Sequence, residues 1–141
     1  MIYLVIPCYN EQEVLEDSTK KLASLIGRMQ GEDMRILFSD DGSRDETWNI
    51  ICKLHHQYPF VEGIRLAHNE GHQKALWAGM EAAADRAEAI ISIDADLQDD
   101  IEVIPRMVAD FRQGADVVYG VRKERDTDSA FKRLTALTFY R

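Results

Sequence analysis

The chain has 141 residues, of which 45% are apolar and 9% aromatic, and its 17 Lys and Arg against 25 Asp and Glu leave a formal charge of −8. This length and apolar fraction are typical of one domain with a hydrophobic core, and they exclude a disordered tail, a collagen-like chain and a disulfide-stapled scaffold. The acidic balance argues against non-specific nucleic-acid binding, because a phosphate backbone attracts a basic surface.

The two cysteines, Cys8 and Cys52, lie in apolar stretches without the spacing of a metal site or a redox motif, which favours buried thiols in a reducing environment. The first residues lack a basic start and are interrupted by Pro7, Asn10 and Glu11, so they do not resemble a signal peptide. No apolar run approaches the roughly 18 residues of a membrane span. We therefore expect this segment, as given, to be soluble.

Short apolar runs alternate with helical patterns along the chain. Five runs rich in Ile, Val and Leu predict buried strands, at residues 2–6, 35–39, 61–67, 89–93 and 116–121. Apolar residues at helical spacing predict helices between them, at 15–29, 48–55 and 76–87, and Pro105 and Gly114 bracket a fourth helix at 105–112. This alternation predicts an α/β three-layer sandwich with a mainly parallel sheet, whose ligand site lies beyond the carboxyl ends of the strands.

Polar segments follow three of the predicted strands and therefore share one edge of the sheet. They are PCYNE at 7–11, DDGS at 40–43 and DADLQ at 94–98. Two of them contain the spacing of a helix-capping box, Asn10 with Glu13 and Ser43 with Glu46. Capping thus explains part of these segments as helix starts.

Capping leaves other polar residues of these segments unexplained. Tyr9 offers a ring that could stack on a base, although a rim aromatic that fills the edge of the sheet is an equal alternative. Asp40 and Asp41 are two adjacent carboxylates at the same edge of the predicted sheet, where we expect the ligand site. At least one of them could accept hydrogen bonds from a nucleobase or a ribose.

Asp94 and Asp96 flank Ala95 at the end of a predicted buried strand, so a turning backbone could direct both carboxylates, with Gln98, to one point. Mg²⁺ and Mn²⁺ take oxygen ligands, typically one or two carboxylates together with substrate phosphates. The alternative is that these aspartates only cap the next helix. The short DxD string alone does not separate the two interpretations.

The turn from Asn69 to His72 connects the third strand to a helix. Gly71 permits a tight turn, and the helix start after it could receive an anion. His72 could be a ligand or a proton carrier, but a surface histidine near a helix start is the favoured interpretation.

Taken in order, five motifs resemble the inverting family 2 glycosyltransferases, which have the GT-A fold. The motifs are VIPCYNE, DDGSRDET, the NEG turn followed by Ala75 and Gly79, DADLQ, and GVRKER. They are most similar to the branch of dolichyl-phosphate mannose synthase and the bacterial polyprenyl-phosphate glucosyltransferases. The resemblance covers nearly all of the chain and implies transfer of a hexose from a UDP- or GDP-linked sugar, with Mg²⁺ or Mn²⁺ as cofactor.

The resemblance also implies roles for individual residues. Those that match the nucleotide-binding positions are Pro7, Tyr9, Glu11, Asp40, Asp41 and Asp94. Those that match the metal site are Asp94, Asp96 and Gln98. Asp96 is expected to be catalytic through the metal, and Asp41 is expected to contact the base.

The last twenty residues concentrate positive charge, although the chain as a whole is acidic. The residues that match cations around a polyprenyl phosphate acceptor are Arg122, which we expect to be catalytic, and Arg125, Lys132 and Arg133. Apolar residues interleave with these cations, which predicts an amphipathic helix that lies on a membrane surface or packs on the remainder of its own domain. The resemblance implies that the full-length protein is associated with the cytoplasmic face of the membrane.

Relatives run on beyond the position of Arg141, so we expect residues 1–141 to be the amino-terminal, nucleotide-sugar-binding part of a GT-A domain that is incomplete at its carboxyl end. Two alternatives remain within this resemblance: a sugar-nucleotide-binding module without turnover, and a family 2 transferase with a polysaccharide hydroxyl acceptor. A receiver-type phosphoacceptor domain is disfavoured, because its acidic pair follows its first strand, where this chain has PCYNE.

Overall fold

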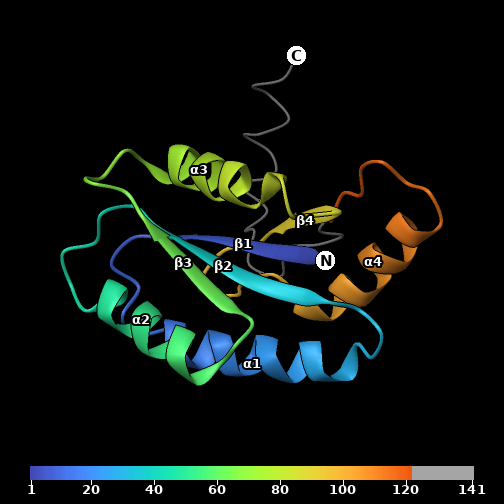
Figure 1. Cartoon of the computed structure of the whole chain (residues 1–141), viewed down its shortest axis with the longest axis horizontal. Helices are drawn as coiled ribbons and strands as arrows, with labels where there is room; N and C mark the ends of the chain where they lie inside the picture. Colours follow the sequence, from blue (N-terminus) through green and yellow to red (C-terminus); the bar gives the residue numbers. More distant parts are fainter. Residues whose placement is uncertain (122–141) are drawn as a thin grey trace, which may run out of the picture.

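The computed structural model describes residues 1–121, in which strands and helices alternate regularly (Figure 1). In chain order they are β1 Ile2–Cys8, α1 Leu15–Arg28, β2 Met34–Asp40, α2 Thr47–Gln57, β3 Val61–Arg65, α3 His72–Ala84, β4 Ala89–Ser92, the 3₁₀ turn η1 Ile101–Val103 and α4 Ile104–Arg112. The strands form one sheet of order β3-β2-β1-β4, and all of its pairings are parallel. The predicted α/β architecture is confirmed.

The sheet lies between two helical layers, with α3 on one face and α1 and α2 on the other (Figure 1). Helices α1, α2 and α4 share one apolar core with β1 and β2, in which Leu4 and Phe38 are fully buried. On the α3 face, Tyr3 and Val5 of β1 form a second core. Side chains of β1 therefore alternate between two covered faces, which explains why the whole strand is buried.

Helix α3 packs unusually close to the sheet. Gly79 lies so near β1 that a Cβ atom built on it would meet Val5 Cγ1 at 2.6 Å. The hydroxyl of Ser39 in β2 donates a buried hydrogen bond to the carbonyl oxygen of Ala75 at 2.6 Å. These contacts fix the position of α3, and its first residues therefore lie at the carboxyl edge of the sheet.

Residues 116–121 do not form the fifth strand that their pattern predicts. The alternating side chains of Val117, Tyr119 and Val121 are 66%, 83% and 81% exposed. A cavity of about 480 Å³, lined by Ile90 and Val118 among others, separates the segment from the edge strand β4. A strand requires a backbone partner as well as alternating side chains, and within residues 1–121 this segment has none.

Smaller expectations about helix ends and cysteines are confirmed. Pro105 lies in the first turn of α4, and Gly114 follows the end of that helix with a φ of 101°. Cys8 is buried, Cys52 is half-buried, and both are free thiols. Within residues 1–121 no helix is both long and apolar enough to cross a lipid bilayer.

Candidate functional site

The PCYNE and DDGS segments bind each other where β1 and β2 end. The amide of Asn10 donates to Ser43 Oγ at 2.9 Å, and the amide of Arg44 donates to Asn10 Oδ1 at 2.9 Å. The amide of Glu11 donates to Thr47 Oγ1 at 2.8 Å. The two loops are therefore one unit, held together by side chains that satisfy the backbone of the neighbouring loop.

This arrangement replaces the two predicted capping boxes, which are wrong. Helix α1 has Val14 at its N-cap and α2 has Glu46, and neither residue makes a side-chain capping bond. Asn10 and Ser43 instead lie before the helices and bond across to the other loop. Short polar side chains serve either purpose, and only the fold decides between them.

Asp40 is fully buried, and its carboxylate binds other residues of the chain. Its Oδ1 accepts hydrogen bonds from the amide of Ser43 at 3.1 Å and from the hydroxyl of the same residue. Its Oδ2 lies 3.1 Å from Nε of Arg65, an ion pair whose angle does not meet hydrogen-bond geometry. Arg65 also donates to the carbonyl oxygen of Ser43 at 2.8 Å. Asp40 thus shapes the β2–α2 loop from inside.

Asp41 is 1% exposed and binds the connection between β3 and α3. Its Oδ1 accepts from the amide of Glu70 at 2.7 Å, and its Oδ2 accepts from the amide of Gly71 at 2.8 Å. Each carboxylate oxygen keeps a second lone pair. The expected contact of Asp41 with a base stays a prediction that would have to use one of these.

Of the residues expected around the nucleoside, Tyr9 is 38% exposed and Glu11 is half-buried, whereas Pro7 is buried inside β1. Burial raises the pKa of the Glu11 carboxyl, and the negative charges of Asp96, Asp45 and Asp94 raise it further. The PCYNE and DADLQ segments are therefore electrostatically coupled at the carboxyl edge of the sheet.

The DADLQ segment forms a turn that is anchored underneath and exposes its acidic side chains. Ala95 is buried, and its carbonyl oxygen accepts a hydrogen bond from Ser18 Oγ of α1 at 2.6 Å. Asp94 and Asp96 on either side of it are exposed. Asp96 Oδ1 accepts from the amide of Gln98 at 3.2 Å, which closes the turn.

Asp94 and Asp96 offer exposed carboxylate oxygens, the ligand type that Mg²⁺ and Mn²⁺ prefer, but they do not form a complete metal site. Within residues 1–121 no three His, Cys, Asp or Glu side chains are arranged to hold a metal ion by themselves. Mg²⁺ commonly takes one or two carboxylates and completes its shell with substrate phosphates and water. The helix-capping alternative applies to Asp100, whose Oδ1 accepts from the amide of Glu102 at 3.0 Å.

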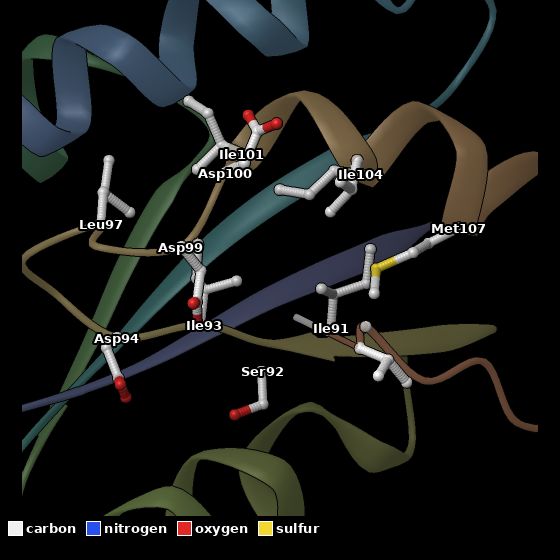
Figure 2. A pocket seen from close by; sticks show the side chains of 13 residues that line it. Ile91, Ser92, Ile93, Asp94, Leu97, Asp99, Asp100, Ile101, Ile104 and Met107 are labelled. Carbon is white, nitrogen blue, oxygen red and sulfur yellow. The ribbon is translucent and has the colours of Figure 1, made fainter. Parts of the chain in front are cut away.

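A cavity of about 590 Å³ is lined by Asp94, Asp99 and Asp100 as well as by apolar side chains (Figure 2). Its aliphatic lining includes Ile91, Ile93, Leu97, Ile101, Ile104 and Met107. In Figure 2 the carboxylate of Asp94 points away from Ile101 and Ile104. Gly120 and Val121 also line the cavity, so the segment that leads to Arg122 borders it. The expected acceptor residues, Arg122, Arg125, Lys132 and Arg133, lie outside the described residues.

Three side chains take positions around the site that the sequence did not signal. His72 is an exposed histidine at the start of α3, as the favoured interpretation expected, and its Nε2 also lies 3.7 Å from Asp94 Oδ1, a contact that was not predicted. Arg65 and Ser18 support the DDGS and DADLQ segments from other elements. Each of these contacts joins residues far apart in the chain, so no local pattern encodes it.

Comparison with known proteins identifies the same family as the sequence motifs. The family model described as glycosyl transferase family 2 matches residues 3–140. An uncharacterized glycosyltransferase of Bacillus subtilis, YkoT, is 46% identical over 146 residues, covering 100% of this chain and 43% of the relative. The prophage bactoprenol glucosyl transferase homolog of Escherichia coli K12 is 39% identical over 140 residues, covering 99% of this chain and 45% of the relative. The chain thus spans less than half the length of these relatives.

Solved structures share the fold. The crystal structure of Staphylococcus aureus TarS residues 1–349 has a TM-score of 0.62 at 19% identity, and the match covers 87% of this chain and 40% of the chain in that structure. The structure of the same TarS segment in complex with UDP-GlcNAc has a TM-score of 0.60 at 17% identity, and the match covers 87% of this chain and 38% of the chain in that structure. At such identities the likeness establishes the fold alone, and the GT-A-type fold expected from the motifs is confirmed.

Proposed function

The chain belongs to glycosyl transferase family 2, and from this premise we propose that it supplies the donor-binding part of an inverting enzyme that moves a hexose from a nucleotide-diphosphate sugar to a polyprenyl phosphate. The observation that carries the proposal is the position of Glu11, Asp94 and Asp96 on the segments that directly follow β1 and β4, where Asp94 and Asp96 are exposed and Glu11 is half-buried. This is where open α/β sheets bind their ligands.

The donor half of the proposal rests on complementary chemistry. Tyr9 offers an aromatic face for a base, and Glu11 and Asp41 offer acceptors nearby. Asp94 and Asp96, with Gln98, would hold Mg²⁺ or Mn²⁺ against the diphosphate. Such a cation, when bound, stabilises the negative charge that develops on a leaving nucleoside diphosphate. The carboxylates of this chain would orient it from a turn that Ser18 anchors.

The acceptor half is supported by the relatives named bactoprenol glucosyl transferases, at 39% identity. A phosphate oxygen is already ionised near neutral pH, so it can attack the anomeric carbon without a strong general base. One displacement of this kind inverts the anomeric configuration. Arg122, which follows directly on the cavity-lining Val121, would position the phosphate.

A lipid acceptor requires the complete protein to meet a membrane surface. The basic and apolar residues of the last twenty positions have the composition of a helix that binds there by apolar burial and by attraction to anionic lipids. We therefore propose membrane association for the complete protein, at the cytoplasmic face where nucleotide sugars are available.

The test of the donor site is the effect of Asp96→Ala on nucleotide binding. The unmodified chain should be stabilised against heat by UDP or GDP more strongly with Mn²⁺ than without it, because the cation links carboxylates and diphosphate. Asp96→Ala should remove this Mn²⁺-dependent increment. The matched control is Asp85→Ala, at the far end of α3, which should retain it.

Three outcomes would change the proposal. An unchanged Mn²⁺ increment in Asp96→Ala would show that the metal assignment is wrong. Nucleotide binding without sugar transfer, in a form that spans the length of the relatives, would favour the alternative of a binding module without turnover. Transfer to a neutral hydroxyl in that form would favour the polysaccharide acceptor.

A further inference from the structure

His72 and Asp94 face each other across the carboxyl edge of the sheet, one at the start of α3 and the other directly after β4. Their closest atoms, Nε2 and Oδ1, are 3.7 Å apart, and the side chains are 60% and 63% exposed. This separation is slightly longer than a hydrogen bond. Because both side chains are mainly solvent-exposed, a small torsional change of either one brings the imidazole N–H to the carboxylate.

The backbone that carries His72 is held from below by the DDGS loop. Asp41 binds the amides of Glu70 and Gly71, the two residues directly before His72. The amide of Asp41 in turn donates to the carbonyl oxygen of Cys8 at 2.9 Å, at the end of β1. A chain of hydrogen bonds therefore links the end of β1 to Gly71, the residue directly before α3.

A second contact places the same connection. Gly42 lies so close to it that a Cβ atom built there would meet the carbonyl carbon of His68 at 2.7 Å. Together with the packing of Gly79 on β1, this contact fixes both the loop before α3 and the helix itself. His72 is thus an exposed side chain whose backbone is held in place by hydrogen bonds and close packing.

The charged neighbours of His72 on its own loop are paired with one another. Glu70 binds both His68 and Lys74. Across the sheet edge, the carboxylate of Asp94 is the ionic partner of His72. The two histidines therefore have different partners: His68 binds Glu70 within the loop, whereas His72 faces Asp94 across the edge of the sheet.

We propose that His72 is a positioning residue for Asp94, an inference that rests on the proposed donor site. Its Nε2–H donates to one oxygen of the Asp94 carboxylate and leaves the other oxygen for the cation. Carboxylates that bind metal ions are commonly held in this way by an outer hydrogen bond, whose loss typically lowers metal affinity by about 10–100-fold. The neutral imidazole suffices, so no change of protonation is required.

The test is Mn²⁺ affinity in the presence of saturating UDP, followed by the loss of the free Mn²⁺ signal in electron paramagnetic resonance. His72→Ala should weaken Mn²⁺ binding about tenfold, while UDP affinity without metal and the melting temperature stay unchanged. His72→Gln, which keeps an N–H donor, should restore part of the affinity. His68→Ala, on the same loop, should behave as the unmodified chain.

A double variant separates positioning from an independent effect. In an Asp94→Asn background, His72→Ala should cause no further loss of Mn²⁺ affinity, because the two residues act as one unit. An unchanged affinity in His72→Ala, or a full additional loss in the double variant, would overturn the inference alone. Failure of the unmodified chain to bind UDP at all would overturn the proposed function together with it.

Discussion

Gly42 is the residue at which a single methyl group should disturb the site most. Its φ of 67° lies in the left-handed region, and its Cα faces the backbone of His68. Gly42→Ala would add a left-handed penalty of about 1–2 kcal/mol and an overlap with main chain that costs roughly another 1–3 kcal/mol. We expect a loss of about 3 kcal/mol in the free energy of unfolding, measured by urea denaturation.

Gly31 provides the matched control for this substitution. It has a φ of 90°, but an added Cβ atom would meet nothing within 4 Å. Gly31→Ala should therefore cost only the left-handed penalty of about 1–2 kcal/mol. Equal losses for the two variants would show that the close approach between Gly42 and His68 does not constrain the loop.

Asp41 should make nucleotide binding selective for the base. A uridine or guanosine imide N–H can donate to its carboxylate, whereas adenine has no such N–H. A hydrogen bond to a charged group is worth about 1.5–3 kcal/mol, so UDP or GDP should bind the chain at least about tenfold more tightly than ADP. Calorimetry on the three nucleotides measures this ratio. Equal affinities would leave Asp41 with its observed role, the binding of the Glu70 and Gly71 amides.

At the scale of elements, a network of charges joins the end of α4 to the start of the sheet. Arg112 binds Glu32 and Glu88 at 2.7 Å each, and Glu88 also binds the ammonium group of Met1. The hydrogen bond from that ammonium group, and then the one from Arg112, lower the pKa of Glu88 from 4.5 to about 2. The two ion pairs of Glu88 thus stabilise the fold only while Glu88 is ionised.

The pH dependence of this network follows from the lowered pKa. A carboxyl whose pKa is lower in the folded state stabilises the fold above its unfolded value, and this stabilisation is lost as pH falls from 4.5 to about 2. Glu88→Gln should slightly lower the melting temperature at pH 7, and its difference from the unmodified chain should shrink below pH 4.5. Glu81→Gln, on the exposed side of α3, is the control. A difference that persists unchanged at low pH would contradict this account.

The elements themselves were largely predictable, because the hydrophobic pattern of each is local. The four strands and four helices follow from apolar runs and helical spacing, and β1 is recognisable as a buried central strand by its unbroken apolar residues. Residues 116–121 show the limit of that reasoning, since their alternation is correct for a strand and no partner strand is present within residues 1–121.

The site was predictable as a set of loops but not as a set of contacts. The motifs identified the DADLQ segment, and Asp94 and Asp96 are indeed exposed on its turn. The contacts of three residues could not be predicted. Asn10 and His72 contact Arg44 and Asp94, which lie on other segments of the chain. Ser43 binds Asp40 within its own loop, where the capping pattern predicted a different partner. When a side chain fits a capping pattern, the sequence alone does not show whether it will bind a different partner in the folded chain.

At the scale of the molecule, the proposed donor site is acidic, whereas the residues proposed to bind the acceptor are basic. The chain as a whole is acidic at −8, and Glu11, Asp94 and Asp96 gather at the donor edge. Such an edge repels a diphosphate unless a cation accompanies it, which agrees with a metal-dependent donor. In the sequence, basic residues are concentrated after Val121, which lines the cavity that contains Asp94. Donor and acceptor phosphates would therefore be held by different means.

This division predicts that donor binding and transfer can be separated at Arg122. In a form of the protein that spans the length of the relatives, Arg122→Ala should lower transfer to polyprenyl phosphate by about 10–100-fold, the effect of losing one charged hydrogen bond to the acceptor. Affinity for the nucleotide should persist, because Tyr9, Glu11 and Asp96 are unchanged. The control is Arg106→Ala, on the exposed side of α4. It also removes one positive charge, and it should leave transfer unchanged. Unchanged transfer in Arg122→Ala, or preference for a neutral hydroxyl acceptor, would remove the lipid-phosphate proposal and leave family membership standing.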